Sequence, residues 1–286
     1  MTDRIWKLAH GRDIALGSRA VIMGVVNVTP DSFSDGGRHL DPARAVDHAK
    51  RMIGEGASII DLGGESTRPG GDAVGAEEEQ RRVLPVIARL AAETDVLISV
   101  DTYRSETARR AIDAGAHIVN DVWGLQRDPQ IAGLAAARGA GLVIMHNGRD
   151  RFRLDDQIDD QAAFLGRSLE IADAAGVPRE RIVLDPGFGF AKDVDDNLAL
   201  IARFAELHRF GLPLLAGVSR KRFLGHVTGR TEAAERDVAT AAANVALRLR
   251  GADIFRVHDV AIHRDALAVA DAIVAAGIAA RNRACT

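Results

Sequence analysis

The chain alternates eight times between a short run of apolar residues and a longer stretch in which apolar side chains recur with helical spacing. Runs without polar alternation are typical of strands that are buried on both faces, as they are when helices cover a parallel sheet. The runs lie at residues 21–28, 58–62, 96–100, 117–121, 141–146, 181–185, 212–219 and 253–259. Eight strand–helix units in one chain predict a single (β/α)8 barrel, with residues 1–286 as one domain.

An open, doubly wound sheet is the alternative fold, because it is built from the same alternation of strands and helices. Such a sheet usually carries a glycine-rich G-x-G-x-x-G motif directly after its first strand. Here the first predicted strand is followed by TPDSFSDGG (29–37), which lacks that motif. The closed barrel is therefore the favoured prediction.

Composition argues against several classes of function. The formal net charge is −3, so the chain has no basic excess that would favour nucleic acid or an anionic membrane surface. No run approaches the ~18 apolar residues that span a bilayer. The single cysteine, Cys285, cannot form a disulfide within the chain. We therefore expect a cytoplasmic protein in a reducing compartment, without nucleic-acid or membrane partners.

Every predicted strand ends in at least one polar or ionisable residue. These residues are Asn27, Asp61, Asp101, Asn120, His146, Asp185 and Ser219, with Arg256 and His258 on the last strand. The carboxyl ends of barrel strands meet at one mouth, where active sites lie. Taken alone, Asp61 would fit a helix N-cap equally well. An unpaired buried carboxylate costs several kcal/mol, so eight polar strand ends together predict a ligand pocket.

The basic residues indicate an anionic end of the ligand. Arg220 and Lys221 follow Ser219, and Arg256 and His258 are two residues apart, so that both point to the same face of the last strand. The loops after strands seven and eight of a barrel commonly hold phosphate, which suits Arg and Lys donors. The pattern predicts a phosphate or diphosphate group.

The acidic residues indicate the other end of the ligand. The carboxylates of Asp101 and Asp185, with the amide of Asn120, would suit a flat heterocycle that carries amino and ring N–H donors. Phe190 could supply a flat wall, although a core phenylalanine is the simpler interpretation of that residue alone. Asn27 and Asp35 are hard oxygen ligands, which together with a diphosphate suggest Mg²⁺.

Seven motifs resemble the dihydropteroate synthase family, and they follow one another in order over nearly the whole chain. They are NVTPDSFSDGG (27–37), GGESTRPGG (63–71), SVDT (99–102), IVND (118–121), DPGFGFAKD (185–193), GVSRKRFLG (217–225) and RVHDV (256–260). The resemblance implies a (β/α)8 barrel that is usually a homodimer. It also implies condensation of 6-hydroxymethyl-7,8-dihydropterin diphosphate with p-aminobenzoate, giving dihydropteroate and diphosphate, with Mg²⁺ as cofactor.

The same resemblance implies roles for individual residues. The implied pterin binders are Asp101, Asn120, Asp185 and Lys221, with Phe190 beside them. The implied diphosphate and Mg²⁺ end consists of Asn27, Arg256 and His258, with Asn27 as the metal ligand. The p-aminobenzoate site would be formed by Thr67, Arg68, Pro69 and Ser219. The residues expected to act in catalysis are Asp35, which lies in the first loop, Lys221, Arg256 and His258.

The loop at residues 63–74 has the length and residue order of sulfonamide-sensitive family members, so we expect sulfonamides to compete with p-aminobenzoate. One departure is MHNGRDRFRL (145–154), where the family often reads M-H-M-x-G-x-P. We interpret this charged loop as surface variation outside the pterin contacts. Two alternatives remain: a pterin-dependent methyltransferase, which would need no diphosphate site, and a pterin-binding paralogue without catalysis.

Overall fold

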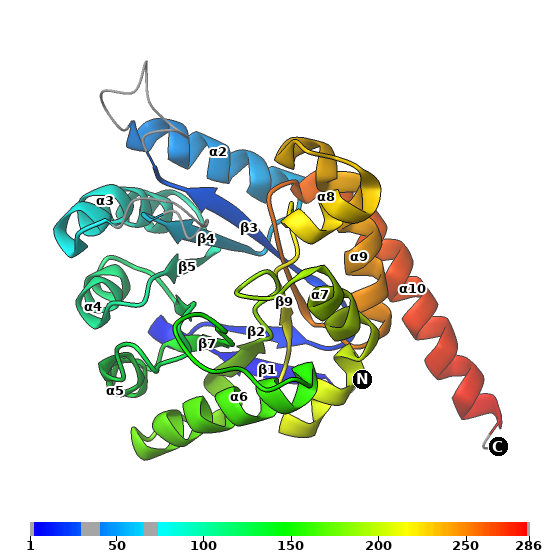
Figure 1. The fold of residues 1–286 in the computed structure, drawn as a ribbon. Coiled ribbons are helices and arrows are strands. Elements are labelled where there is room, and N and C mark those ends of the chain that lie inside the picture. Colours follow the sequence, from blue (N-terminus) through cyan, green and yellow to red (C-terminus); the bar gives the residue numbers. More distant parts are fainter. Residues whose placement is uncertain (1–2, 30–40, 66–73, 285–286) are drawn as a thin grey trace.

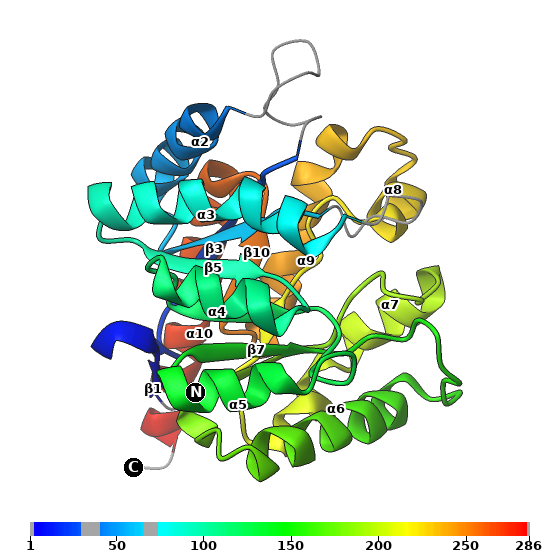
Figure 2. The same ribbon diagram turned by 90° about the vertical axis from the view of Figure 1, so that its left-hand side faces the viewer.

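A computed structural model describes residues 3–29, 41–65 and 74–284, and within these ranges the predicted barrel is confirmed. Eight parallel strands form one sheet, in the spatial order β8-β7-β6-β5-β4-β3-β10-β9. A parallel bridge between Leu184 and Leu214 joins the two ends of that order and closes the barrel. Figure 1 and Figure 2 show the helices arranged around the strands.

The strands are short, and each is followed by a connection that includes a helix. The strands are β3 (Val21–Asn27), β4 (Ile59–Gly63), β5 (Leu97–Asp101), β6 (Ile118–Asp121), β7 (Gly141–Met145), β8 (Ile182–Asp185), β9 (Leu215–Ala216) and β10 (Ile254–Val257). The helices are α2 (Pro42–Glu55), α3 (Ala76–Glu93), α4 (Ser105–Asp113), α5 (Gln130–Arg138), α6 (Gln157–Ala174), α7 (Val194–Ala202), α8 (Arg222–Thr228), α9 (Asp237–Leu249) and α10 (Val260–Ala284). None of these described helices is long and apolar enough to cross a membrane.

Local sequence signals set several of these boundaries. The Asp41 side chain accepts a hydrogen bond from the Ala43 N–H at 2.9 Å, and Pro42 occupies the first position of α2, where a missing N–H costs nothing. Gly56 ends α2 with a φ of 117°, a conformation that L side chains rarely adopt. Strand β9 is much shorter than its predicted run of 212–219, and Pro213, which has no N–H to donate to a neighbouring strand, lies just before its start.

An antiparallel hairpin of β1 (Arg4–Lys7) and β2 (Asp13–Leu16) lies outside the eight predicted units. Its Trp6, Leu8 and Leu16 side chains are buried in one cluster with residues from the barrel strands. The strand residues in that cluster are Val21, Met23, Ile59, Leu97, Ile118, Val143, Val183, Leu215 and Ile254. The hairpin therefore closes the amino-terminal end of the barrel with apolar side chains.

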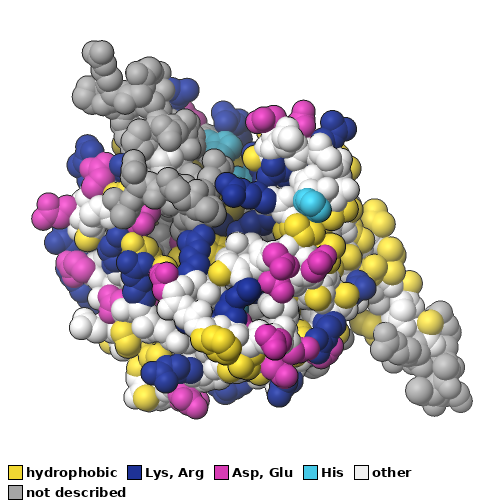
Figure 3. All heavy atoms as spheres, in the orientation of Figure 1, with side chains coloured by type: hydrophobic (Ala, Val, Ile, Leu, Met, Phe, Trp, Pro, Cys, Tyr) yellow, Lys and Arg dark blue, Asp and Glu magenta, His cyan; other side chains and the backbone are white. Residues whose placement is uncertain are grey.

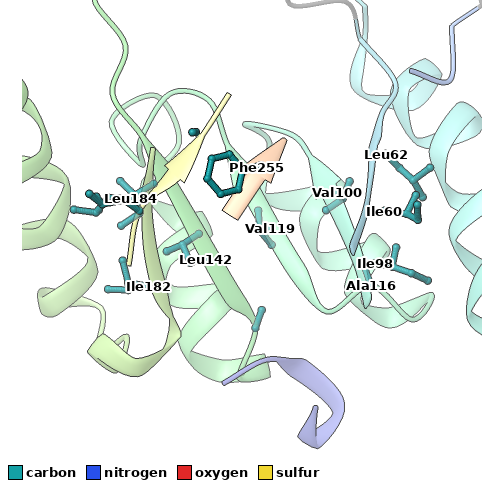
Figure 4. Packing of buried hydrophobic residues seen from close by; sticks show 14 of the residues in the cluster. Ile60, Leu62, Ile98, Val100, Ala116, Val119, Leu142, Ile182, Leu184 and Phe255 are labelled. Atoms are coloured by element: carbon teal, nitrogen blue, oxygen red, sulfur yellow. The ribbon is translucent and has the colours of Figure 1, made fainter. Parts of the chain in front are cut away.

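The other faces of the strands pack against the helices. Figure 4 shows part of this second cluster, in which Ile60, Leu62, Ile98 and Val100 alternate with the residues that point into the barrel. Two positions along each strand from the apolar inner layer comes a different inner layer. Its members are Val25, Asp61, Ser99, Asn120, Met145, Asp185, Gly217 and Arg256, five of which carry polar or charged side chains. The strand period of two thus places a polar layer directly above an apolar one.

We expect Trp6→Ala to reduce the free energy of unfolding by about 3–5 kcal/mol, because it leaves a cavity under the barrel. Trp6 is 1% exposed, and its indole N–H donates to the Arg181 carbonyl at 2.8 Å. Urea unfolding monitored by circular dichroism measures the change. The matched control is Ile5→Ala on the same strand, where the side chain is 46% exposed and a loss below about 1 kcal/mol is expected. Equal losses for the two variants would contradict the role of the hairpin.

Candidate active site

A cleft opens at the carboxyl ends of the barrel strands, above the polar inner layer. Strands β5, β6, β7, β8 and β10 contribute residues to it, as do the segments that follow β6, β8 and β9. Its lining consists of Asp101, Asn120, Val122, Met145, Asp185, Gly187, Phe188, Phe190, Gly217, Lys221 and Arg256. Figure 3 shows Lys and Arg side chains gathered near the middle of one face of the molecule, beside α8.

Arg256 lies at the base of this cleft between two aspartates. Its Nε donates to Asp61 Oδ2 at 2.6 Å, and its Nη2 donates to Asp101 Oδ2 at 2.8 Å. Asp61 is fully buried and also accepts a hydrogen bond from Asn120 Nδ2 at 3.1 Å. Asp61 is therefore a member of the site and not a helix N-cap.

The Asn120 amide is oriented by Asp61. Because Nδ2 points to that carboxylate, Oδ1 is left as an acceptor, and it has no hydrogen-bond partner among the described residues. Asn120 is only 2% exposed, and an unsatisfied buried acceptor is costly. A ligand N–H would satisfy it.

The carboxylates of the cleft are held in a low-dielectric environment. Burial raises the pKa of Asp185 to about 6, against the opposing effects of the Gly187 N–H and the nearby cations. Burial also raises the pKa of Asp101 above its usual range, although the Arg256 guanidinium acts in the opposite direction. Asp185 Oδ1 accepts a hydrogen bond from the Gly187 N–H at 2.7 Å, which fixes the carboxylate plane.

Two cations lie close to Phe190, one of the two phenylalanines that line the cleft. Lys221 Nζ lies 4.4 Å from the Phe190 ring centroid, and Arg149 Cζ lies 4.7 Å from it. Burial lowers the pKa of Lys221 to about 8, and the positive charge of Arg256 contributes to that shift. Phe190 thus makes cation–π contacts with both Lys221 and Arg149.

The match to known proteins agrees with this geometry. The family model described as pterin binding enzyme matches residues 23–258. A dihydropteroate synthase from Streptococcus pyogenes serotype M3 is 48% identical over 251 residues, which cover 87% of this chain and 94% of that protein. The chain belongs to the dihydropteroate synthase family.

Two solved structures extend the similarity to three dimensions. The dihydropteroate synthase from Xanthomonas albilineans, solved with 4-aminobenzoic acid, is 44% identical with a TM-score of 0.89, covering 95% of this chain and 99% of that one. The Yersinia pestis dihydropteroate synthase, solved with a sulfonamide drug, is 40% identical with a TM-score of 0.86, covering 94% and 98%. The similarity therefore extends over nearly the whole fold of these two solved chains.

The structure brings most of the predicted site residues of this family member together. Asp101, Asn120, Asp185, Phe190, Lys221 and Arg256 all line the cleft. Ser219 and His258 form a pair beside it, with Ser219 Oγ 2.9 Å from His258 Nδ1. Asn27 ends β3, and its Oδ1 lies 3.8 Å from the point where a Cβ on Gly63 would sit, as does Asp101 Oδ2. Asp35, Thr67, Arg68 and Pro69, which are also predicted site residues, lie outside the described residues.

The strand end alone fits Asp61 either as a helix N-cap or as a pocket residue, and the strand period distinguishes the two. Asp61 is two residues from the inward-facing Ile59, and it lies opposite Ser99 in the register of β4 and β5. Arg256, which is predicted at the diphosphate end, also contacts Asp61 and Asp101 at the base of the cleft, and nothing in the sequence indicated these two contacts. Met145 and Val122 also line the cleft, but they were not predicted because their side chains are apolar like those of the core.

The interpretation of residues 145–154 as surface variation is wrong for its first part. His146 and Asn147 are buried, and Arg149 packs over Phe190 at the rim of the cleft. Only later residues of the loop are on the surface, such as Phe152, which is 87% exposed. The charged residues of this loop suggested a solvated surface, but Arg151 pairs with the buried Asp160 and Arg149 packs on Phe190.

We expect the affinity for a pterin to fall as the pH is lowered through about 6. Asp185 has a pKa raised to about 6, so it becomes protonated in the folded protein below that value. A protonated carboxyl loses one acceptor that ring N–H donors require. Calorimetric titration with 6-hydroxymethylpterin from pH 8 to pH 5 measures the effect. An affinity that stays constant over this range would contradict the assignment of Asp185 as an ionised acceptor.

Proposed function

We propose that the chain condenses 6-hydroxymethyl-7,8-dihydropterin diphosphate with p-aminobenzoate, and that the residues of the cleft divide this task. The single observation that carries the proposal is the inner layer at the strand ends. There, Asp185 and Asn120 offer buried acceptors within the same cleft that contains Lys221 and Arg256. The two sets of side chains match a donor-rich ring joined to an anionic leaving group.

The pterin end of the substrate would lie against the acceptors. Asp185 uses Oδ1 for the Gly187 N–H, so its second oxygen remains for a ring donor. The free lone pairs of Asn120 Oδ1 accept from a second donor. Phe190 and Met145 give the flat ring apolar walls.

The diphosphate end would lie towards Lys221, Arg256 and His258. The contacts of Arg256 with Asp61 and Asp101 use two of the five N–H donors that a guanidinium carries, so the group can serve both ends. Preorganised cations stabilise the charge that develops on a leaving diphosphate. Ser219, beside His258, would face the p-aminobenzoate together with Thr67, Arg68 and Pro69.

The proposed cofactor is Mg²⁺, with Asn27 as its ligand. No three His, Cys, Asp or Glu side chains in the described ranges are grouped so as to hold a metal ion. Mg²⁺ fits nevertheless, because it commonly takes one or two protein oxygens and completes its shell with water and substrate phosphate. Asn27 Oδ1 is such an oxygen, close to Asp101 across the space that Gly63 leaves open. Bound Mg²⁺ would supply charge neutralisation to the diphosphate.

The chemistry needs orientation more than proton transfer. The bond between the methylene carbon and the diphosphate oxygen breaks, and the arylamine nitrogen forms a bond to the same carbon. An electron-rich dihydropterin can delocalise positive charge on that carbon, so an SN1-like path is proposed. The arylamine is neutral and nucleophilic, and it releases its proton after attack. The cleft therefore acts by aligning both substrates and excluding water from the carbon.

Turnover separates this proposal from its two alternatives. The synthase should release one diphosphate for each dihydropteroate formed, and it should need both p-aminobenzoate and Mg²⁺. A pterin-dependent methyltransferase would bind the pterin but release no diphosphate. A non-catalytic pterin-binding protein would bind the diphosphate ester without consuming it. Liquid chromatography of the products, with and without chelator, distinguishes the three.

We expect sulfamethoxazole to inhibit competitively with p-aminobenzoate. A sulfonamide drug is bound in the Yersinia pestis relative, and residues 63–74 of this chain carry no insertion that would exclude it. Rejecting the drug would require a steric clash added against it. Steady-state kinetics over a range of p-aminobenzoate provides the test. The expectation would be refuted if the drug did not inhibit at a concentration about a hundredfold above the KM of p-aminobenzoate, or if added p-aminobenzoate did not relieve the inhibition.

We also propose a homodimer in the cytoplasm, with α9 and α10 as the contact surface. Val269 and Ile273 are 61% and 50% exposed and lie one turn apart on α10, and Val238 of the adjacent α9 is 75% exposed. Figure 3 shows apolar side chains along this helix. Exposed apolar surface of this kind marks interfaces. Light scattering should give twice the chain mass for the parent protein and the monomer mass for Ile273→Glu.

A further inference from the structure

A buried lysine lies behind the cleft, on the segment between β8 and α7. Lys192 is 8% exposed, and its Nζ has two partners at 2.9 Å, the Gly187 carbonyl and His146 Nδ1. Neither partner is an anion. Burial lowers the pKa of Lys192 to about 7, opposed by the charges of Asp185 and Asp160. Keeping an amine at this position therefore costs the folded state free energy.

His146 connects Lys192 to a second buried side chain, Asp160. It is fully buried at the end of β7, and its Nε2 lies 2.9 Å from Asp160 Oδ2. Since Lys192 donates to Nδ1, the proton of the neutral ring lies on Nε2 and is donated to Asp160. Arg151 Nη2, which lies 2.8 Å from the same Nε2, then donates to Asp160 Oδ2 at 2.5 Å. The atypical loop thus holds the imidazole in one orientation.

Gly187 connects the lysine to the cleft. Its carbonyl also accepts from the Phe190 N–H at 3.2 Å, and its own N–H donates to Asp185 Oδ1 at 2.7 Å. Its φ is +65°, and an added Cβ would collide with the His146 carbonyl oxygen, so Gly187 is closely packed against the backbone that follows β7. Gly187 therefore contacts Asp185 through the N–H of one peptide group and carries the turn to Phe190 through the carbonyl of the next, so that the two contacts meet at a single residue.

We propose that Lys192 and His146 are positioning residues for the pterin pocket: His146 orients Lys192, and Lys192 holds the carbonyl of Gly187, the residue whose carbonyl also accepts from the Phe190 N–H and whose own N–H contacts Asp185. The inference rests on the proposed function, since it assigns these two residues to the pterin end of that site. A group that only stabilised the fold would be better served by an apolar side chain of similar length. The amine is needed where a carbonyl and a ring nitrogen must be held at once.

Two substitutions of His146 separate its two contacts. An asparagine side chain places its oxygen near the position of Nδ1, so His146→Asn keeps an acceptor for Lys192 and loses the contact with Asp160. A glutamine side chain reaches the position of Nε2, so His146→Gln keeps the Asp160 side and loses the acceptor for Lys192. Lys192→Met removes the amine while retaining an unbranched side chain. Lys7→Met is the control, because Lys7 is exposed on β1 and pairs with Asp13 at the opposite end of the barrel.

The experiment measures the Kd of 6-hydroxymethylpterin by calorimetry and the KM of each substrate, with thermal unfolding to verify that each variant is folded. We expect Lys192→Met and His146→Gln to weaken pterin binding at least about tenfold while the KM for p-aminobenzoate changes less than about threefold. His146→Asn and Lys7→Met should stay within about threefold of the parent. The double variant Lys192→Met/His146→Gln should bind no more weakly than either single variant, because both remove one contact.

Several results would overturn the inference. Pterin affinity near that of the parent in Lys192→Met and His146→Gln would do so, and so would equal losses in His146→Asn and His146→Gln. Parallel increases in the KM of both substrates, accompanied by a lower Tm, would show a role in stability alone. If Lys192→Met does not fold, the comparison of the two His146 variants decides. A parent protein that fails to bind the pterin at all would contradict the proposed function and not this network in particular.

Discussion

Arg256→Met should lower kcat/KM by about a thousandfold or more. Two effects combine in this substitution. The first is the loss of a cation beside the leaving diphosphate, which typically costs about 10²–10³ in rate. The second is the exposure of Asp61 and Asp101 to each other without the guanidinium that bridges them at 2.6 and 2.8 Å. Breaking a buried ion pair by removing one partner costs about 3–5 kcal/mol of stability.

The measurement combines steady-state kinetics with urea unfolding, so that loss of activity can be separated from loss of folded protein. Arg256→Lys is an informative companion, because a compact ammonium group cannot bridge two carboxylates as a planar guanidinium does. We expect that variant to recover little activity. Arg110→Met is the control, since this arginine is half exposed on α4. If Arg256→Met kept more than about a tenth of the parent kcat/KM, the proposed role of Arg256 would be wrong.

Asp185→Asn should raise the Kd of a pterin by about 10- to 100-fold. The side-chain oxygen of the asparagine can keep the hydrogen bond from the Gly187 N–H, so its NH2 group would face the cleft. A donor would then oppose the N–H donors of the ring. Charge-assisted hydrogen bonds contribute about 1.5–3 kcal/mol, and a mismatched donor adds a desolvation cost.

Calorimetry with 6-hydroxymethylpterin tests this expectation without requiring turnover. Asp195→Asn serves as the control, because Asp195 is exposed in the first turn of α7 and does not line the cleft. The substitution of Asp185 should also remove the decrease in affinity near pH 6. An affinity equal to that of the parent in a folded Asp185→Asn protein would exclude Asp185 from the pterin contacts.

The barrel was predictable because its evidence is local. A strand covered on both faces is apolar along its whole length, and the helices between strands show their own period, so eight units could be counted from the sequence alone. The polar strand ends were equally visible, since Asp101, Asn120 and Asp185 each follow a run of apolar residues. Parallel strands in a barrel bring such residues to the same end.

What could not be predicted depends on pairs that are far apart in the chain. Arg256 and Asp61 are 195 residues apart, and no local pattern says that one neutralises the other. The same holds for Lys192 and His146, which are 46 residues apart. The charged sequence of the loop that contains His146 is typical of a solvated surface. The N-terminal hairpin was missed because its strands, RIWK and DIAL, include charged residues and form no continuous apolar run. Its role depends on the apolar layer that it covers.

The central claim is that the pterin binds to the polar inner layer, which lies above the apolar cluster that the N-terminal hairpin closes. The most direct test is a crystal structure of the protein with 6-hydroxymethylpterin bound. The account predicts ring N–H donors within about 3.2 Å of the Asp185 carboxylate and of Asn120 Oδ1, with the ring packed beside Phe190. A pterin bound elsewhere, or bound in the cleft with its donors turned away from Asp185 and Asn120, would contradict it.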